Sequence, residues 1–247
     1  MIKENQHTVK SPVVSCKKIA ITQSNYIPWK GYFDSINMVD EFILYDDMQF
    51  TKRDWRNRNK IKTPGELHWL TIPVEVKGKF FQKIRETRIS DPAWNKSHFA
   101  TLKQFYSKSA CWNETKDFME DLYVHATSDS LSEINYYFLS KICAYLNINT
   151  PIRFSDEFIL AEGKTERLVD LCRQLNATDY YTGPAAKNYM DESLFEKENI
   201  KVHYFDYTGY SEYPQLNPPF EQSVSIVDLI FNTGHRSSSY LKSFGNT

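Results

Sequence analysis

The sequence has 247 residues, of which 41% are hydrophobic and 25% charged, and its formal net charge is -1 at pH 7. This composition is ordinary for one large globular domain. The near-neutral charge argues against a bulk nucleic-acid binder, because phosphate backbones select a basic face. Aromatic residues are enriched, at 15%. Most should pack in the core, although tyrosine and tryptophan also suit sugar or base recognition.

The four cysteines are scattered, without the spacing of a metal site. Such usage is typical of reduced thiols in a cytosolic protein, so we expect a cytoplasmic location. Residues 1–17 are polar and are predicted to be a flexible tail, without the apolar segment of a signal peptide. No apolar run approaches the roughly 18 residues of a membrane span. Residues 18–247 are predicted to form a single α/β domain, with a helical subdomain at about 94–148.

The first elements predict a βαβ unit. An apolar strand at 19–21 precedes a polar loop and an amphipathic helix at 29–38, and a second apolar strand follows at 42–45. Strands joined by a crossover helix lie parallel. The later predicted elements are strands at 67–76 and 83–90, helices between 94 and 146, a strand at 152–155, a helix at 164–175, a strand at 179–181, a short helix at 191–198, a strand at 202–205 and a helix or strand at 225–232. This alternation predicts an α/β fold with a mostly parallel, Rossmann-like sheet and a helical insertion.

Three loops, at 23–31, 46–62 and 182–189, follow predicted strands. Ligands of open parallel sheets bind beyond the carboxyl ends of the strands, so we expect these loops to converge on one site. The first loop carries Gln23 as a candidate catalytic residue, whose side-chain amide can orient a ligand. It also supplies the candidate substrate-binding residues Asn25, Tyr26 and Trp29. The alternative is that these polar groups satisfy their own backbone.

The second loop begins with a pair of carboxylates, Asp46 and Asp47. Such a pair can act as a general base, accept sugar hydroxyls or hold a metal, although aspartate also favours caps and turns. Residues 52–62 follow, and six of these eleven are cationic. Arginine and lysine bind phosphate oxygens, so a diphosphate would fit here, unless the segment is a solvated basic face. The candidate substrate-binding residues of this segment are Lys52, Trp55, Arg56, Asn57, Arg58 and Lys60.

The third loop supplies the candidate substrate-binding residues Thr182, Gly183 and Lys187. Backbone N–H groups can approach a ligand closely here, or Gly-Pro simply marks a turn.

The motifs of other common enzyme classes are absent from the sequence. The sequence has no G-x-S-x-G elbow, no G-x-x-x-x-G-K-[ST] loop and no H-E-x-x-H, and its histidines are isolated from one another. No metal site is predicted.

The motif Gln23-x-Asn25-Tyr26-x-Pro28-Trp29-x-Gly31-Tyr32-Phe33 resembles the WbqC-like family. The similarity extends over about residues 17 to 235. It departs from the family pattern at Thr22, where a histidine is usual, at Ser24, where a proline is usual, and at Thr182, where a serine is common. Further matching motifs are Asp40-x-Phe42-Ile43-x-x-Asp46-Asp47-x-Gln49-Phe50, Trp55-Arg56-Asn57-Arg58-Asn59-x-Ile61-Lys62, Trp69-Leu70-Thr71-x-Pro73-Val74, Tyr181-Thr182-Gly183-Pro184-Ala185-Ala186-Lys187-x-Tyr189 and Ser225-Ile226-Val227-Asp228-Leu229-Ile230-Phe231-Asn232.

This resemblance implies a bacterial protein from gene clusters for surface polysaccharides, often the O-antigen of lipopolysaccharide. Those clusters can include amino sugars that carry a glycyl group on the amine. The leading hypothesis is an aminoacyltransferase that joins glycine, or a similar amino acid, to the amine of a nucleotide-linked amino sugar such as dTDP-4-amino-4,6-dideoxyglucose. Asp46 or Asp47 would accept the amine proton. Arg56, Arg58 and Lys60 would hold phosphates, and Gln23 and Asn25 would orient the acceptor.

The acyl donor is left open between adenylation by ATP with Mg²⁺ and a charged tRNA, so the expected partners are a nucleotide-linked sugar and an aminoacyl-tRNA. Two other functions stay open. In a glycosyltransferase the aspartates would bind a metal, and the basic segment would hold the diphosphate leaving group. A non-catalytic protein would bind the nucleotide sugar without turnover. The oligomeric state is not predicted.

Overall fold

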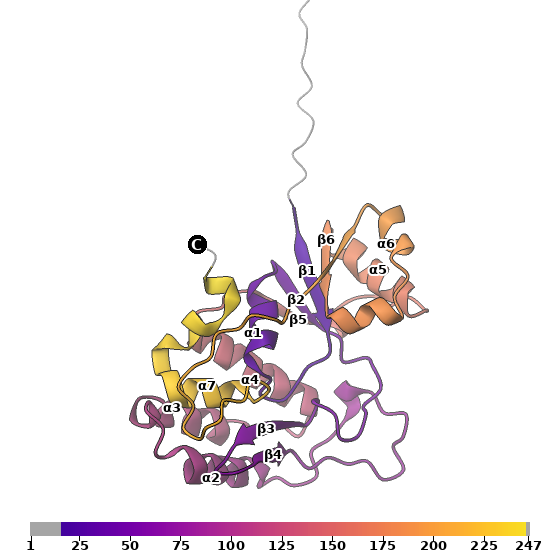
Figure 1. Ribbon diagram of the computed structural model, residues 1–247. Helices are drawn as coiled ribbons and strands as arrows, with labels where there is room; N and C mark the ends of the chain where they lie inside the picture. Colours follow the sequence, from indigo (N-terminus) through magenta and orange to yellow (C-terminus); the bar gives the residue numbers. More distant parts are fainter. Residues whose placement is uncertain (1–15, 246–247) are drawn as a thin grey trace, which may run out of the picture.

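The computed structural model describes residues 16–245, so residues 1–15 of the predicted tail lie outside the described part. Five strands form a parallel sheet in the order β5-β2-β1-β6-β7 (Figure 1). This confirms the predicted α/β fold with a Rossmann-like parallel sheet. The strands are β1 (Lys18–Thr22), β2 (Glu41–Leu44), β5 (Ile152–Phe154), β6 (Asp179–Thr182) and β7 (Lys201–Tyr204).

Each face of the sheet buries its own set of side chains, because successive strand residues point to opposite faces. Ile19, Ile21 and Ile43 pack with α5 (Thr165–Gln174) and α6 (Ser193–Lys197). Ala20 and Phe42 belong to the other core, with α1 (Lys30–Asn37). Helices therefore cover both faces, as Figure 1 shows with α5 and α6 on one side of β1 and α1 on the other.

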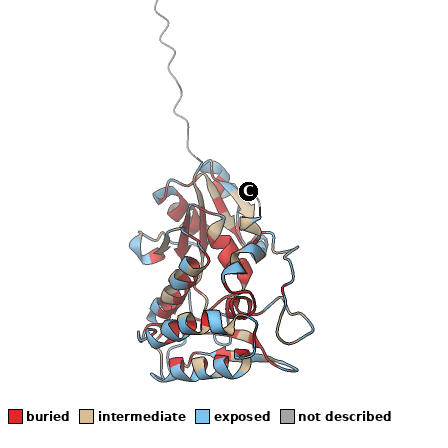
Figure 2. Ribbon diagram, turned by 90° about the vertical axis from the view of Figure 1, so that its left-hand side faces the viewer, coloured by how far each residue is buried: buried red, intermediate tan, exposed pale blue. Residues whose placement is uncertain are grey.

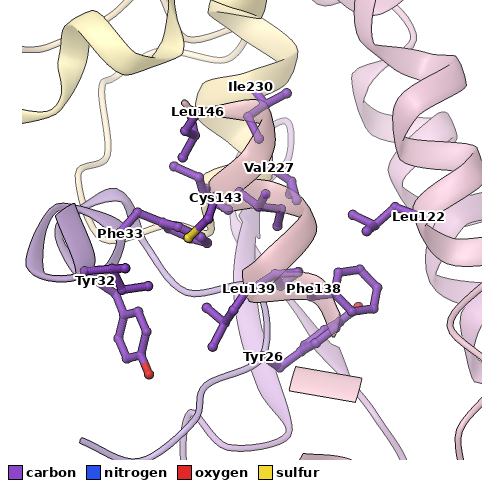
Figure 3. Packing of buried hydrophobic residues seen from close by; sticks show 14 of the residues in the cluster. Tyr26, Tyr32, Phe33, Leu122, Phe138, Leu139, Cys143, Leu146, Val227 and Ile230 are labelled. Atoms are coloured by element: carbon purple, nitrogen blue, oxygen red, sulfur yellow. The ribbon is translucent and has the colours of Figure 1, made fainter. Parts of the chain in front are cut away.

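The predicted helical segment forms α2 (Trp94–Tyr106), α3 (Trp112–Val124) and α4 (Leu131–Tyr145). Its inner surfaces join the larger core, which Phe138, Leu139 and Cys143 of α4 share with residues of α1 and of α7 (Ile226–Thr233) (Figure 3). The buried residues of the helices line their inward sides (Figure 2). The 3- and 4-residue apolar spacing seen in the sequence thus marks the buried stripe of each helix. The division into a tail, one domain and a helical subdomain stays a prediction.

The basic segment forms a strand, where the sequence suggested a polar loop. β3 (Arg58–Lys62) pairs antiparallel with β4 (Leu67–Thr71) in a separate two-stranded ribbon. Asn59 and Ile61 are buried, and the cationic residues at 58 and 60 occupy the opposite face. The ribbon lies against the loop that follows β1, because the side-chain amide of Asn59 donates to the backbone oxygens of Tyr26 and Ile27.

Three predicted elements change. The strand predicted at 67–76 ends at Thr71, shortly before Pro73, which cannot donate to a ladder. The strand predicted at 83–90 is wrong, since this segment contains a short 3-10 helix and isolated bridges. The ambiguous segment at 225–232 is helical, with Ser225 as the N-cap of α7.

The 3-10 helices are η1 (Ile84–Glu86), η2 (Ser155–Glu157), η3 (Pro184–Asn188), η4 (Gly234–Tyr240) and η5 (Lys242–Phe244). Within residues 16–245, no helix has the length and apolar character needed to cross a membrane.

Candidate functional site

The main candidate site lies at the carboxyl edge of the sheet, beside β1. β2 lies on one side of β1 and β6 on the other, which makes the carboxyl ends of β1 and β6 a topological switch point. A cavity of about 680 Å³ opens there, and we call it the sheet-edge cavity. Residues of all three predicted loops line it, so their expected convergence is confirmed. The lining is Ile21, Thr22, Gln23, Tyr45, Met48, Arg56, Gly163, Lys164, Arg167, Leu168, Tyr180, Thr182, Gly183, Ala185, Ala186 and Tyr189.

The charge of this cavity is positive. Arg56, Lys164 and Arg167 line it, and none of the lining residues within the described range 16–245 is acidic. Among the described residues, Lys164 and Arg167 have no carboxylate within 4 Å, and Nε of Arg167 donates to the carbonyl of Ala161 at 2.7 Å. The N-terminus of α5 adds free backbone N–H groups, since its cap residue, Lys164, makes no side-chain capping bond. The cavity therefore suits an anionic ligand such as a diphosphate.

Arg56 is fixed in the wall of the cavity. Its Nη1 donates to the backbone oxygens of Gln23 at 3.4 Å and Ser24 at 3.3 Å, and also to Oδ1 of Asn25. Its Nε lies 3.7 Å from the carboxylate of Asp54. Burial lowers the pKa of the Arg56 guanidinium, and the charge of Asp54 opposes this shift. Arginine stays protonated in proteins even so, which leaves a rigid, desolvated cation beside the loop after β1.

Asp46 is held away from the cavity lining. Its carboxylate is 1% exposed and accepts hydrogen bonds from the backbone N–H of Ser24 at 2.8 Å and from the hydroxyl of Ser132. Burial raises the pKa of Asp46, while the hydrogen bonds from Ser132 and Ser24 oppose the shift. Asp46 thus fastens the loop after β1 to the first turn of α4. Its role as a general base stays a prediction.

Asp47 is also engaged elsewhere. Its Oδ1 accepts from Nζ of Lys83 at 2.9 Å and forms an ion pair with Arg85, whose Nε lies 3.0 Å away, and its Oδ2 accepts from the hydroxyl of Ser155 at 3.0 Å. Burial acts to raise the pKa of Asp47, but the hydrogen bonds from Lys83 and Ser155 and the charge of Arg85 lower it overall. In this geometry Asp47 ties the second loop to the segments before and after the helical insertion.

A second, smaller cavity of about 240 Å³ lies beside the β3/β4 ribbon, and we call it the tryptophan cavity. Trp29 forms one wall, where the rings of Tyr207 and Tyr210 hold it edge-on at centroid distances of 5.4 Å. Asn59 supports the floor, because its amide donates to the backbone oxygens of Tyr26 and Ile27. The lining is Asn25, Pro28, Trp29, Trp55, Asn59 and Ser223.

The structure therefore divides the predicted site residues into groups. Gln23, Arg56, Thr182 and Gly183 line the sheet-edge cavity, and Asn25, Trp29 and Trp55 line the tryptophan cavity. The other predicted binding residues lie outside both linings: Tyr26, Lys52, Asn57, Arg58, Lys60 and Lys187.

Tyr26 and Asn57 make buried contacts. The hydroxyl of Tyr26 hydrogen-bonds to Nδ1 of His98 at 2.9 Å and to the hydroxyl of Tyr123 at 2.7 Å. The amide of Asn57 donates to the backbone oxygen of Ile72 at 2.8 Å. Both therefore hold the fold behind the loops. Lys52 and Lys187 are exposed, and Nζ of Lys187 lies 4.5 Å from the centre of a tyrosine ring on β7.

Sequence reasoning missed Lys164 and Arg167. Lys164 ends a fourth loop at the same edge, which leaves β5 and enters α5, and Arg167 lies in the first turn of that helix. The signal was present, because both the strand at 152–155 and the helix at 164–175 were predicted. A strand followed by a helix in a parallel sheet places the intervening loop at the carboxyl edge. The aromatic lining residues Tyr45, Tyr180 and Tyr189 were also missed, because a tyrosine that lines a cavity and one that packs in the core look alike in a sequence.

No group of three or more histidine, cysteine, aspartate or glutamate side chains is arranged to hold a metal ion within residues 16–245. The thiols do not line either cavity. Burial raises the pKa of Cys143 to about 12, so this thiol is a weak nucleophile at neutral pH.

Comparison with known proteins gives two matches. The model of the WbqC-like protein family matches residues 23–240. "Uncharacterized protein Rv1507c" of Mycobacterium tuberculosis (strain ATCC 25618 / H37Rv) is 52% identical over 226 residues, which is 92% of this chain and 98% of that protein. No solved structure matches this chain. The family match includes every residue named in the two cavities except Ile21 and Thr22.

Proposed function

This chain belongs to the WbqC-like protein family, and we propose that it is a transferase that attaches an aminoacyl group, glycyl being the expected one, to the amine of a nucleotide-linked amino sugar. The observation that carries the proposal is the sheet-edge cavity, which presents Arg56, Lys164 and Arg167 without an acidic neighbour in its lining. Such a cavity at a topological switch point favours a nucleoside diphosphate. A substrate of this class is dTDP-4-amino-4,6-dideoxyglucose, in keeping with a role in O-antigen biosynthesis.

The lining suggests how this substrate is oriented. The diphosphate lies against Lys164, Arg167 and the N-terminus of α5. The rings of Tyr45 and Tyr189 offer apolar faces for the base or the sugar. Gln23 and Thr182, at the ends of β1 and β6, also line the cavity, and their polar groups can hold the sugar hydroxyls and the amine.

The reaction requires an activated carboxyl group. The amine nitrogen attacks the carbonyl carbon of the aminoacyl donor, a C–N bond forms, and the C–O bond to the leaving group breaks. The leaving group is the ribose hydroxyl of a charged tRNA, or AMP when ATP has first activated the amino acid with release of pyrophosphate. The amine proton passes to the leaving oxygen or to water. In this proposal, Arg56 stabilises the negative charge that develops on the carbonyl oxygen.

For Asp46 and Asp47 we propose a positioning role, whereas the sequence predicted a catalytic one. Since their carboxylates have buried partners and lie outside the cavity lining, we propose that they position the loops after β1 and β2. The metal-dependent glycosyltransferase alternative relied on the same pair, so this geometry also weakens it.

The test combines product analysis with binding. Purified protein receives dTDP-4-amino-4,6-dideoxyglucose, glycine, ATP and Mg²⁺, with and without glycyl-tRNA, and mass spectrometry follows the sugar nucleotide. A product heavier by one glycyl residue supports the proposal. Cleavage of the sugar–phosphate bond would instead favour the glycosyltransferase. Binding without any turnover would favour a non-catalytic nucleotide-sugar binding protein.

A matched pair of variants tests the cavity itself. Arg167→Ala removes a cation from the lining, whereas Arg173→Ala removes an exposed cation from the same helix, outside the cavity. One charge-assisted contact to phosphate contributes about 1.5–3 kcal/mol, so Arg167→Ala should weaken sugar-nucleotide binding about 10- to 100-fold in calorimetry. Arg173→Ala should bind like the unaltered protein. Equal affinities for the two variants would contradict the assignment of the cavity.

A further inference from the structure

We propose that the tryptophan cavity and the adjoining face of the β3/β4 ribbon bind the nucleotide portion of the acyl donor, by stacking a base on Trp55 and contacting its phosphates with Arg58 and Lys60. The ligand chemistry is a nucleobase joined to phosphate, whether it belongs to ATP or to the 3′ end of a charged tRNA. Only the ligand's role as acyl donor rests on the proposed function. The binding site stands on the observations below.

The first observation is a pair of accessible indole rings. Trp55 is 39% exposed, lines the tryptophan cavity, and lies 5.4 Å from Trp69 between ring centroids. The two rings are tilted by 38° to each other, and Trp55 keeps enough surface in water to present an aromatic plane to a ligand. Bases stack on such planes regardless of their identity, because every base has a π-face.

The second observation is the charge around these rings. The Arg58 guanidinium lies 3.9 Å from the centre of the Trp69 ring, and Nζ of Lys60 lies 5.3 Å from Trp69 and 5.7 Å from Trp55. Strand alternation places both cations on the same face of β3, and Lys60 pairs directly with Trp69 across the ribbon. We call Trp55, Trp69, Arg58 and Lys60 the tryptophan face.

The cations of this face form no close ion pair, although the charge of Arg58 helps to lower the pKa of Asp54. Within the described part of the chain, neither Arg58 nor Lys60 has a carboxylate within 4 Å. The nearby Asp54 carboxylate is occupied, since it accepts from the hydroxyl of Thr51 and the backbone N–H of Trp55, both at 2.7 Å. The protein as a whole carries a net charge of -1, so this is a local concentration of positive charge. Aromatic rings interleaved with free cations form the combination that binds bases and phosphates together.

The third observation links the two cavities. Asn25 lines the tryptophan cavity, Arg56 lines the sheet-edge cavity, and Nη1 of Arg56 donates to Oδ1 of Asn25. The loop after β1 and Arg56 therefore form a wall that both cavities share. An acyl donor anchored on the tryptophan face and a sugar nucleotide in the sheet-edge cavity would meet at this wall, which is the arrangement that a two-substrate transfer requires.

The experiment measures binding of two probes to the full-length protein: ATP with Mg²⁺, and a short RNA that ends in the CCA sequence of tRNA. Quenching of tryptophan fluorescence reports stacking, and calorimetry gives the affinity. Trp55→Ala should weaken binding of the bound probe by at least about tenfold, the loss expected for one stacked base. Lys60→Gln should weaken it several-fold and reduce its salt dependence.

Two control variants alter comparable exposed side chains elsewhere. Phe81→Ala removes a ring that is 82% exposed, and Lys103→Gln removes an exposed cation of α2. Both should bind the probes as the unaltered protein does. Binding of ATP but not RNA identifies a free nucleotide as the donor source, and the reverse identifies the tRNA end. If neither probe binds, or if Phe81→Ala loses as much affinity as Trp55→Ala, the inference is overturned.

Binding of dTDP-4-amino-4,6-dideoxyglucose separates this inference from the proposed function. Trp55→Ala should leave its affinity unchanged, because this ligand occupies the sheet-edge cavity. If Trp55→Ala abolishes binding of the sugar nucleotide and Arg167→Ala does not, the tryptophan face binds the sugar nucleotide and the donor assignment is overturned. If the sugar nucleotide does not bind while RNA or ATP still binds through Trp55, the proposed function fails and the nucleotide site remains.

Discussion

Replacement of Asp46 by alanine distinguishes a structural carboxylate from a catalytic one. The backbone N–H of Ser24 and the hydroxyl of Ser132 donate to Asp46, and both serine residues are buried. The alanine variant leaves these two donors without their acceptor. Each unsatisfied buried donor costs about 1–3 kcal/mol, so the free energy of unfolding should fall by about 2–6 kcal/mol. Since a domain is stable by only about 5–15 kcal/mol, this loss is easily measured.

Asp46→Asn is the matched control, because asparagine keeps the volume and one acceptor oxygen. It should lose about half as much stability as the alanine variant. The pKa of Asp46 is raised in the folded state, so folding favours its protonated form. The contribution of this titration to stability is therefore full below the unfolded pKa, and it declines as the pH rises through the folded pKa. Acidification across this window should stabilise the unaltered protein relative to Asp46→Asn.

Urea unfolding followed by circular dichroism measures these differences as shifts of the midpoint at constant slope. An Asp46→Ala variant with the midpoint of the unaltered protein would refute the argument, because the two hydrogen bonds would then contribute nothing. A different outcome would restore the catalytic hypothesis: an Asp46→Asn variant that keeps its stability and binds the sugar nucleotide normally, but loses turnover, would identify Asp46 as the base.

Three other variants test further contacts. Asp47→Asn should cost about 1–2 kcal/mol in urea unfolding at neutral pH, a modest value because Lys83 and Arg85 remain 40% and 39% exposed. Since the folded pKa of Asp47 is lowered, this difference should disappear as the pH falls through the folded value. Asp228→Ala removes the buried acceptor of Tyr106, Tyr213 and Gln215 and, at about 1–3 kcal/mol for each unsatisfied donor, should lower the free energy of unfolding by at least about 3 kcal/mol, seen as a large drop in the thermal midpoint. Gly31→Ala places a Cβ where the Trp29 ring now lies. It should change the near-UV circular dichroism and weaken ATP or RNA binding several-fold, and sugar-nucleotide binding should stay unchanged.

The sheet was predictable because its signals are local. Short apolar runs separated by an amphipathic helix define β1, α1 and β2, and the topology of parallel sheets then determines which loops meet. Once the strands were identified, Gln23, Thr182 and Gly183 could be assigned to one edge. The period of two in residues 58–62, with Asn59 and Ile61 buried, was also present. The many polar residues of this segment hid its strand pattern. Asn59 is buried because it hydrogen-bonds to the backbone of the loop after β1, and not because of apolar packing.

The hydrogen-bond partners of Asp46 and Asp47 could not be predicted from the neighbouring residues in the sequence. Asp46 finds Ser132 on α4 and Asp47 finds Lys83 and Ser155, all far along the chain. An adjacent pair of carboxylates at a strand end looks the same whether tertiary contacts occupy it or a ligand does. Long-range hydrogen bonds decide between these states, and they depend on packing that no local pattern records.

The position of Arg56 supports a site built for negative charge. A buried guanidinium costs free energy unless anions compensate it, and the nearest carboxylate, on Asp54, lies at 3.7 Å with part of its own charge directed to Thr51 and to a backbone N–H. Carbonyl and amide oxygens supply most of the contacts of Arg56. An anionic ligand in either cavity would therefore gain from a cation that is already desolvated and fixed in direction. Two phosphate-bearing substrates would also repel each other less with this charge between them, because a charge in a low-dielectric wall acts more strongly than one in water.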